Sequence, residues 1–254
     1  MGTFTFNGTS SSQFGLRVTS DYVINSTGQD ISTVSVAGRD GDLLLSNNRL
    51  KSVTIELPCT IMSNKKLTDA GSDISNWLNV DGYKDLTLSW DPDFIYRSAF
   101  IETFEIASLM RQFGKVKLNF LTYPVKFYKQ GRTTQTLQNG ATVNGIGNVN
   151  AKPIITLVGS GDCTLTINGR KTKLRAVQNT ITLNMQANQV YSGNLPAWDK
   201  VVRAPQYQMP YLDAGRNLIS WDGDFTVKMA PYWGVKLWCL YFLTKMSSHL
   251  TLTV

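Results

Sequence analysis

The stretch VTIELPCTI, residues 53–61, decides the fold class of this sequence. Its apolar residues occupy every second position: Val53, Ile55, Leu57, Cys59 and Ile61. Successive side chains of an extended chain point to opposite faces, so this alternation predicts a long strand with one buried face. Pro58 falls on the other face.

The same alternation recurs in other segments, which are separated by Gly, Asn, Asp and Pro. Their apolar positions are Phe4 and Phe6; Leu86, Leu88 and Trp90; Val116, Leu118 and Phe120; Cys163, Leu165 and Ile167; Ile181, Leu183 and Met185; and Phe225, Val227 and Met229. A period of two in so many segments predicts a mainly β fold with antiparallel pairing.

One segment, residues 65–80, departs from this period. Its apolar residues follow helical spacing: Leu67, Ala70, Ile74, Trp77 and Leu78. Thr68 and Asp69 suit a helix N-terminus, where a hydroxyl and an early carboxylate are favoured. The sequence therefore predicts a single α-helix among the strands of the first half.

The composition of the chain changes at residues 129–149, KQGRTTQTLQNGATVNGIGNV. This segment is rich in Gly, Asn and Thr and offers almost nothing to bury, which is typical of a linker. We expect two domains, residues 1–130 and residues 131–254. The short alternating segments of the second domain predict a compact β-sandwich.

The composition favours a protein that works through contacts with other chains. Only 17% of the 254 residues are charged, while 11% are aromatic, as in a chain that hides much of its surface. The net charge of +7 makes acidic partners a consideration. The densest basic stretch, residues 170–175, follows Asn168-Gly169 and is better explained as the return strand of a hairpin with a solvated face than as a phosphate groove.

Cysteine usage and the chain's first residues indicate a cytosolic product. The three cysteines, Cys59, Cys163 and Cys239, lie far apart, which favours buried reduced thiols over disulfides or a zinc ribbon. The first residues lack the features of a signal peptide. The longest apolar run, residues 237–243, is too short to span a bilayer, and we expect it in a core strand or a subunit contact.

Residues suited to catalysis are scarce. His249 is the only histidine and lies near the last residue of the sequence. The carboxylate pairs Asp91/Asp93 and Asp222/Asp224 each bracket a Pro or Gly directly after Trp90 or Trp221, which is typical of turns rather than of a glycosidase or calcium site. We predict no catalytic residues, no metal ligands and no cofactor, and hence no enzyme.

The segment Gly38-Arg39-Asp40-Gly41 places opposite charges side by side between two glycines. Glycines mark positions that need a positive φ or close backbone approach. The segment suggests a fixed, salt-bridged corner. An ordinary surface turn, an anion-binding nest and half of an intermolecular contact are the alternatives.

Four stretches together carry a resemblance to a family. They are VAGRDG at 36–41, WLNVDGYKDLTLSWDPDFIYRSAF at 77–100, VNGIGNVNAKPIITLVGSGDCTLTING at 143–169 and YLDAGRNLISWDGDF at 211–225. In order and spacing they resemble the distal tail protein (Dit) family of long-tailed siphophages. The resemblance extends along nearly the whole chain, although this sequence continues past Pro231-Tyr232-Trp233, where relatives commonly stop.

The resemblance implies a mainly β fold with an N-terminal ring-forming domain, which holds the helix, and a C-terminal galectin-like β-sandwich. The last strand is expected either to return to the first domain or to form a contact particular to this protein. Arg39 and Asp40 are then expected to form a corner of the ring domain and to pair within or across subunits. The further structural or interface candidates are Gly38, Gly41, Trp77, Trp90, Trp221 and Trp233.

The function implied by the resemblance is structural. Six copies would form a homohexameric hub at the virion tail tip or baseplate after assembly in the host cytoplasm. The ring would join the tail tube protein to the tail-associated tip protein and anchor baseplate or receptor-binding proteins, with no dedicated nucleic-acid site and no membrane.

Two alternatives to a hub remain open at this point. One is a carbohydrate-binding sandwich that recognises the host surface, for which Trp198 is a candidate, although a loop or core anchor explains that residue more simply. The other is a nucleic-acid-binding β domain, which only the net charge of +7 favours.

Overall fold

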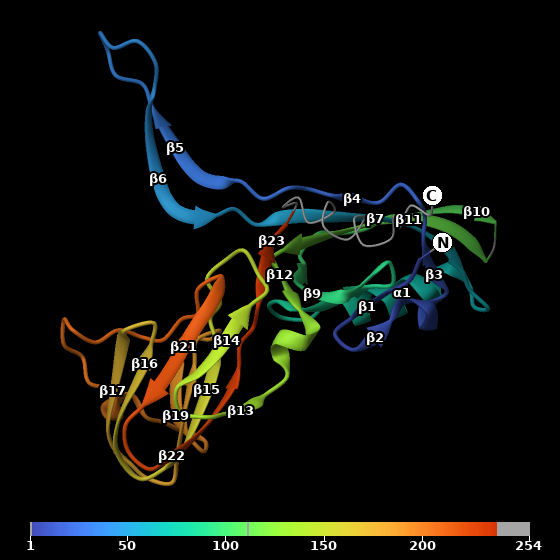
Figure 1. Cartoon of the computed structure of the whole chain (residues 1–254). Coiled ribbons are helices and arrows are strands. Elements are labelled where there is room, and N and C mark those ends of the chain that lie inside the picture. The colour runs from blue at the N-terminus through green and yellow to red at the C-terminus, as the bar shows by residue number, and fades with distance from the viewer. Residues whose placement is uncertain (1, 111, 238–254) are drawn as a thin grey trace, which may run out of the picture. The chain divides into compact units, whose positions relative to one another are not determined.

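The computed structural model describes residues 2–110 and 112–237. These residues form two compact units. Of the described residues, the first unit comprises those up to Lys126 together with Lys236 and Leu237, and the second comprises Phe127–Val235. The chain is mainly β, as the alternation predicted, and its described part holds one α-helix (Figure 1).

The strand predicted at residues 53–61 is β7, Val53–Met62, and every second side chain from Val53 to Ile61 is buried. It pairs antiparallel with β11, Phe113–Thr122, along its whole length. The largest sheet runs in the order β2-β1-β8-β9-β11-β7-β3, with β4, β10, β12 and β23 paired alongside. The boundaries between the two units fall within β12 and β23. The remaining strands of this sheet are β1 Phe4–Phe6, β2 Thr9–Ser10, β3 Leu16–Val18, β4 Val23–Ile24, β8 Lys84–Leu88, β9 Asp91–Phe100, β10 Ile106–Met110, β12 Val125–Tyr128 and β23 Gly234–Lys236.

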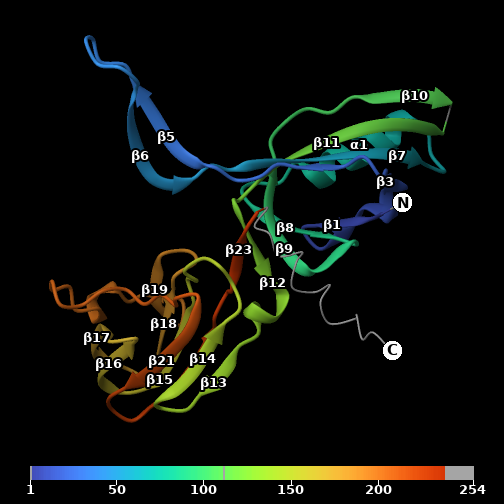
Figure 2. The same cartoon turned by 45° about the horizontal axis from the view of Figure 1, so that its top comes forward.

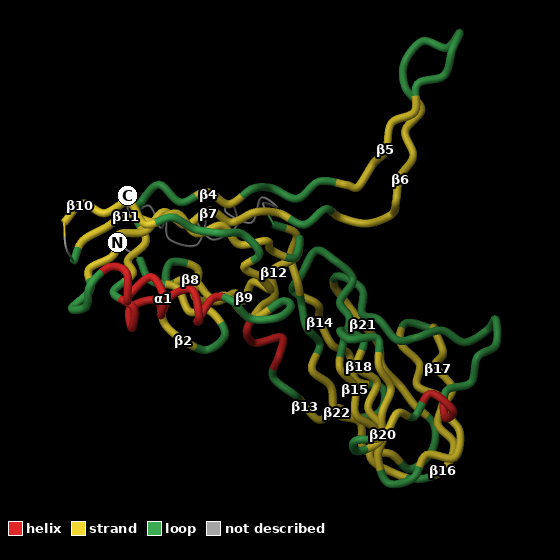
Figure 3. Tube along the Cα trace, turned by 180° about the vertical axis from the view of Figure 1, so that it is seen from behind, coloured by secondary structure: helices red, strands yellow, loops and turns green. Residues whose placement is uncertain are grey.

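The predicted helix is α1, Leu67–Leu78, drawn in red beside the first-unit strands in Figure 3. It begins at Leu67, one residue before the expected Thr68, and no side chain caps its first turn. Its apolar stripe enters the core of the unit, where Trp77 stacks on Phe4 and Phe14 at centroid distances of 5.6 and 4.5 Å. The Trp77 indole N–H donates to the carbonyl of Phe6 at 3.1 Å, so the polar atom of this buried ring is satisfied.

One strand pair stands apart from this sheet. Strands β5, Gln29–Val34, and β6, Leu43–Leu50, pair only with each other. We call residues 29–50 the arm. Figure 2 shows it as a separate two-stranded ribbon that continues from the segments around β4 and β7.

The second unit is built from two antiparallel sheets, of order β13-β22-β15-β18-β19-β20 and β14-β21-β16-β17. Its strands are β13 Gln135–Leu137, β14 Ala141–Gly145, β15 Ile154–Gly159, β16 Gly161–Ile167, β17 Arg170–Val177, β18 Thr180–Asn184, β19 Gln189–Ser192, β20 Leu195–Pro196, β21 Gly215–Trp221 and β22 Phe225–Ala230. Both sheets contribute fully buried side chains, among them Leu157 and Val227 from one and Leu165 and Ile219 from the other. This is the construction of a β-sandwich.

The prediction that residues 129–149 form a linker is wrong. They contain a short 3-10 helix, Lys129–Arg132, and strands β13 and β14, which pair at the ends of the two sheets with β22 and β21. End strands gain their hydrogen bonds from the backbone and bury few side chains, so their sequence carries little apolar signal. The glycines serve close packing here: a Cβ at Gly147 would lie 2.1 Å from the carbonyl oxygen of Gly234.

Candidate assembly surface

The tip of the arm is formed by the Gly-Arg-Asp-Gly segment. Gly38 and Gly41 have φ of +81° and +78°, in the region that favours glycine, as the sequence indicated. The Arg39 N–H donates to the Val36 carbonyl at 3.2 Å and closes the turn. Both charged side chains are exposed, and neither forms an ion pair within the described part of this chain. A pairing of Arg39 with Asp40 across copies therefore stays a prediction.

The arm is held in register by its own backbone and by charges at its base. Val34 faces Leu43 and Thr33 faces Leu44, and a bulge near Asp30 shifts the register. The Asp30 carboxylate pairs with Arg49 at 2.5 Å and with Lys51 at 3.8 Å. The hydrogen bond from Arg49 lowers the pKa of Asp30.

Apolar side chains are exposed on both faces of the arm. Leu44 is 65% exposed on one face, and Leu45, 48% exposed, lies on the other. Further exposed apolar residues of the arm are Ile31, Val34, Val36 and Leu43. An isolated two-stranded hairpin is at best marginally stable in water, and an apolar hairpin with free edges attracts other strands. The arm therefore has the character of a surface that another chain covers.

A second exposed apolar patch lies where β7 and β10 end and β11 begins. It consists of Met62, Leu109, Met110 and Phe113, of which Met110 is 69% exposed. Phe113 faces Met62 across the β7–β11 pair, so these two residues are held together by strand register. We call these four residues the strand-end patch. Exposed apolar patches on folded domains mark interaction sites more often than chance.

The four candidate tryptophans do not form one surface. Trp77 and Trp233 are buried within their own units. Trp221 is half-buried, and its indole N–H donates to the carbonyl of Phe225 at 2.9 Å. Trp90 is half-buried and packs on Tyr22 at 4.6 Å, with its indole nitrogen buried and without a hydrogen-bond partner in the described structure. Burial of Trp77 and Trp233 makes them structural in the single chain.

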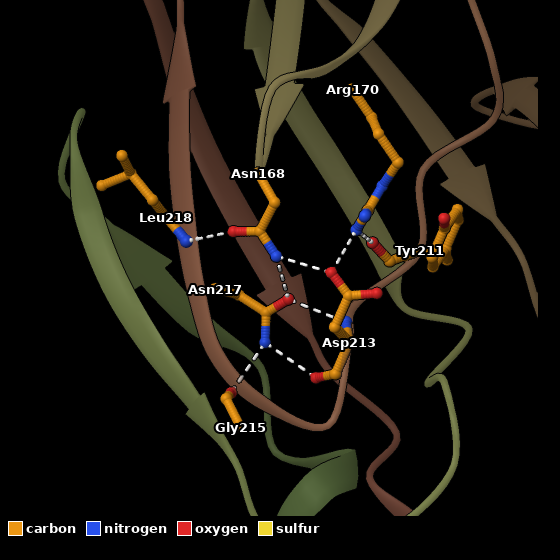
Figure 4. A network of polar contacts seen from close by, with 7 residues as sticks. All are labelled: Asn168, Arg170, Tyr211, Asp213, Gly215, Asn217 and Leu218. Carbon is orange, nitrogen blue, oxygen red and sulfur yellow. Dashed lines mark hydrogen bonds and ion pairs between the residues drawn. The ribbon is translucent and has the colours of Figure 1, made fainter.

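A polar network ties strand β21 to the β16–β17 hairpin in the second unit (Figure 4). Asn217 is fully buried, and its side-chain oxygen accepts from Asn168 at 3.1 Å and from the Asp213 N–H at 2.8 Å. Its amide nitrogen donates to the carbonyls of Asp213 and Gly215, both at 2.9 Å. A fully satisfied buried amide of this kind fixes a loop in one conformation.

The carboxylate of Asp213 is the charged member of the network. It accepts from Asn168 at 2.7 Å and from Arg170 at 2.9 Å, and the Arg170 guanidinium lies 3.8 Å from the centroid of the Tyr211 ring. The hydrogen bond from Asn168, followed by that from Arg170, lowers the pKa of Asp213. The network contains no nucleophile beside a base, so we assign it to structure.

One carboxylate of each acidic pair has a structural partner, and the two described cysteines are buried. Asp91 accepts from Tyr96 and from Lys126, and Asp222 accepts from the N–H of Thr164. Among the residues that the structure describes, no three His, Cys, Asp or Glu side chains are grouped as a metal site. Burial raises the pKa of the Cys59 and Cys163 thiols to about 12, which suppresses the thiolate at neutral pH.

Some predictions fall on residues beyond Leu237. His249, Cys239 and the apolar run 238–243 lie outside the described residues. Leu237 itself is buried in the core of the first unit. No helix in the described ranges is long and apolar enough to cross a membrane.

Comparison with known proteins supports the resemblance found in the sequence. Residues 1–123 match the family described as "Phage tail protein N-terminal domain". The SPbeta prophage-derived uncharacterized protein YomH of Bacillus subtilis (strain 168) is 24% identical over 170 residues, which cover 61% of this chain and 66% of that protein. The match thus spans just under two thirds of the relative's length.

Solved structures extend the similarity to the fold of the chain. The crystal structure of phage SPP1 Dit (gp 19.1), described in its title as a paradigm of a hub adsorption apparatus, aligns with a TM-score of 0.66 at 18% identity, covering 90% of this chain and 98% of that one. A baseplate structure of phage p2 aligns with a TM-score of 0.49 at 10% identity, with coverages of 90% and 97%. The fold is Dit-like, and the resemblance to phage tail proteins is confirmed.

Proposed function

We propose that this chain is a structural hub of a phage tail, in which six copies close into a ring at the tail tip or baseplate. The ring connects the tail tube to the tail-associated tip protein and anchors baseplate or receptor-binding proteins during host adsorption. The Dit-like fold and the N-terminal family match support a structural role in the tail. The hexamer and the partners follow from the resemblance.

The observation that carries the self-assembly is the arm. It exposes Leu43, Leu44 and Leu45 on a hairpin that has no third strand. A head-to-tail contact between identical copies closes into a ring when the rotation fits, and each copy then gives one arm and receives one. Covering three leucines removes apolar area from water at about 25 cal/mol per Å², which favours the ring over the free chain.

The test is the mass of the purified chain by light scattering, with negative-stain images. We expect six copies, about 170 kDa from a chain of 28.3 kDa, and six-fold rings. The variant L43S/L44S/L45S is expected to run as a monomer with an unchanged fold. A wild-type protein that stays monomeric contradicts the proposal.

A matched control separates the arm from general loss of surface hydrophobicity. Val158, Leu195 and Leu218 are also exposed apolar residues, and all lie in the second unit. The variant V158S/L195S/L218S removes the same kind of side chain without touching the arm, and we expect it to form rings. Rings from the arm variant would show that the arm is not the contact. Monomers from the control would show that the loss of ring formation is not specific to the arm.

A further inference from the structure

A loop in the second unit leaves and rejoins strand β17. Val201 bridges Leu174 in antiparallel fashion, and Tyr207 bridges Lys171 in parallel fashion. The N–H of Val202 donates to the Lys173 carbonyl at 2.9 Å. The segment between these bridges is therefore tied to the strand at both ends and borders an open pocket of about 460 Å³.

The pocket is pre-formed. Its inner wall includes Thr172, which is 3% exposed and donates its hydroxyl to the carbonyl of Gln208 at 2.6 Å. The Tyr207 N–H donates to Ala204 at 2.9 Å, and a short 3-10 helix, Trp198–Lys200, forms the approach to the loop. Small-molecule sites are typically concave, of about 300–1,000 Å³, and already formed before the ligand binds.

The lining combines aromatic rings with one cation that has no carboxylate partner in the described part of the chain. Trp198 and Tyr207 line the pocket and are half-buried, so part of each side chain remains accessible. The Arg203 guanidinium lies 5.3 Å from the Trp198 ring centroid. Arg203 is exposed and has no carboxylate partner in the described part of the chain. Aromatic rings offer flat apolar contact area, and a guanidinium binds carboxylate or phosphate through paired hydrogen bonds.

The carboxylates near this region are already paired. Asp199 contacts Lys200 at 3.3 Å, and Asp162 contacts Lys173 at 3.9 Å. Among the described residues that line the pocket, Arg203 is the only charged one, so the lining presents a positive charge to a ligand. The pocket volume of about 460 Å³ lies within the range of small-molecule sites.

We propose that this pocket binds a saccharide that carries an anionic group. The ring of Trp198 contacts the apolar face of a sugar unit, and Arg203 binds its carboxylate, phosphate or sulfate. This activity is independent of the ring: either can be present without the other. It gives the second unit a role in contact with an acidic surface polysaccharide.

The experiment uses the full chain on an array of immobilised saccharides that includes uronic-acid, phosphorylated and sulfated forms beside their neutral counterparts. We expect retention of acidic forms, with Trp198→Ala weakening binding of all forms more than 10-fold. Arg203→Gln is expected to weaken binding of acidic forms about 10-fold and to leave neutral forms unchanged. Thermal unfolding of each variant checks that the unit still folds.

Two control variants lie in the same unit outside the pocket. Leu195→Ala removes an exposed apolar side chain, and Arg175→Gln removes an exposed cation on β17. Both are expected to bind like the wild type. The proposal is overturned if no acidic saccharide is retained, if binding survives Trp198→Ala, or if Arg175→Gln weakens it as much as Arg203→Gln. Loss of a tail-protein contact by Trp198→Ala without any saccharide binding would make the pocket a protein site and overturn it equally.

Discussion

The carboxylate of Asp213 accepts hydrogen bonds from both Asn168 and Arg170. These bonds lower its pKa in the folded chain below the ordinary value of 3.8. The unfolded chain then binds more protons than the folded chain at acidic pH. The stability that the carboxylate contributes is therefore complete above the ordinary pKa and is lost as the pH falls through the lowered folded-state pKa.

We predict that Asp213→Asn lowers the free energy of unfolding by about 1 kcal/mol at pH 7, because Asp213 is only partly buried and water screens its charge. This corresponds to roughly 2–4 °C in Tm. The difference from the wild type should shrink below pH 4. Scanning calorimetry from neutral to acidic pH measures it, with Asp199→Asn at an exposed carboxylate as control. A difference that does not change with pH would contradict the assignment.

For individual residues, the sequence predicts backbone conformation better than it predicts side-chain contacts. The glycines of the Gly-Arg-Asp-Gly segment were correctly predicted from their type, because a positive φ is a local property. Asn168-Gly169 was likewise correctly predicted as a hairpin turn between β16 and β17. The network around Asn217 was not predicted, because its members are distant in sequence and meet only in the folded sandwich. Apart from Arg170, its members lie in two of the four resembling stretches, 143–169 and 211–225, and this was the available signal.

In the arm, the apolar character of the sequence does not correspond to burial in the structure. Leu43, Leu44 and Leu45 are apolar, yet all three are exposed in the single chain. Pattern alone does not tell burial in the chain's own core from burial against another copy. The long alternating strands and the helix were correctly predicted because each is buried by its own unit, where periodicity decides the outcome.

The charges at the arm tip test whether the tip itself takes part in the contact. We predict that Arg39→Asp or Asp40→Arg alone weakens ring formation about 3- to 5-fold per contact, in line with an exposed ion pair of up to about 1 kcal/mol. The double variant R39D/D40R exchanges the charges and is expected to restore the ring. Light scattering across a dilution series measures the effect.

The same three variants provide their own control. Because neither residue forms an ion pair within the described chain, monomer stability should be equal in all of them. Additive rather than compensating effects of the two single changes would show that Arg39 and Asp40 do not pair across copies.

At the scale of the whole molecule, assembly should be visible in thermal stability. When folded copies of the chain bind one another and unfolded copies do not, association stabilises the folded state by mass action. We predict that the Tm of the wild type rises with chain concentration between about 1 and 100 μM, whereas the Tm of L43S/L44S/L45S does not. Fluorescence-monitored unfolding at several concentrations measures this, and equal behaviour of both proteins would argue against arm-mediated assembly.

The fold class and the family resemblance were both within reach of the sequence. The fold class was predicted from apolar residues at every second position. The family resemblance was predicted from four stretches of sequence in fixed order. The Trp198 pocket was only partly predictable: Trp198 was singled out, but Tyr207 and Arg203 were not, because their loop is fixed by bridges to β17 that no local pattern encodes.

The first unit is discontinuous in sequence, and this affects the order in which the two units can fold during synthesis. The second unit is an insertion, since the chain leaves the first unit after Lys126 and returns to it at Lys236. Leu237, a member of the first unit's core, emerges from the ribosome only after the whole inserted sandwich has been made. The sandwich is therefore free to fold first, and the first unit completes its core last. The first unit carries the arm with its exposed apolar side chains. The order of synthesis thus delays completion of the core of this unit until the rest of the described chain has been synthesised.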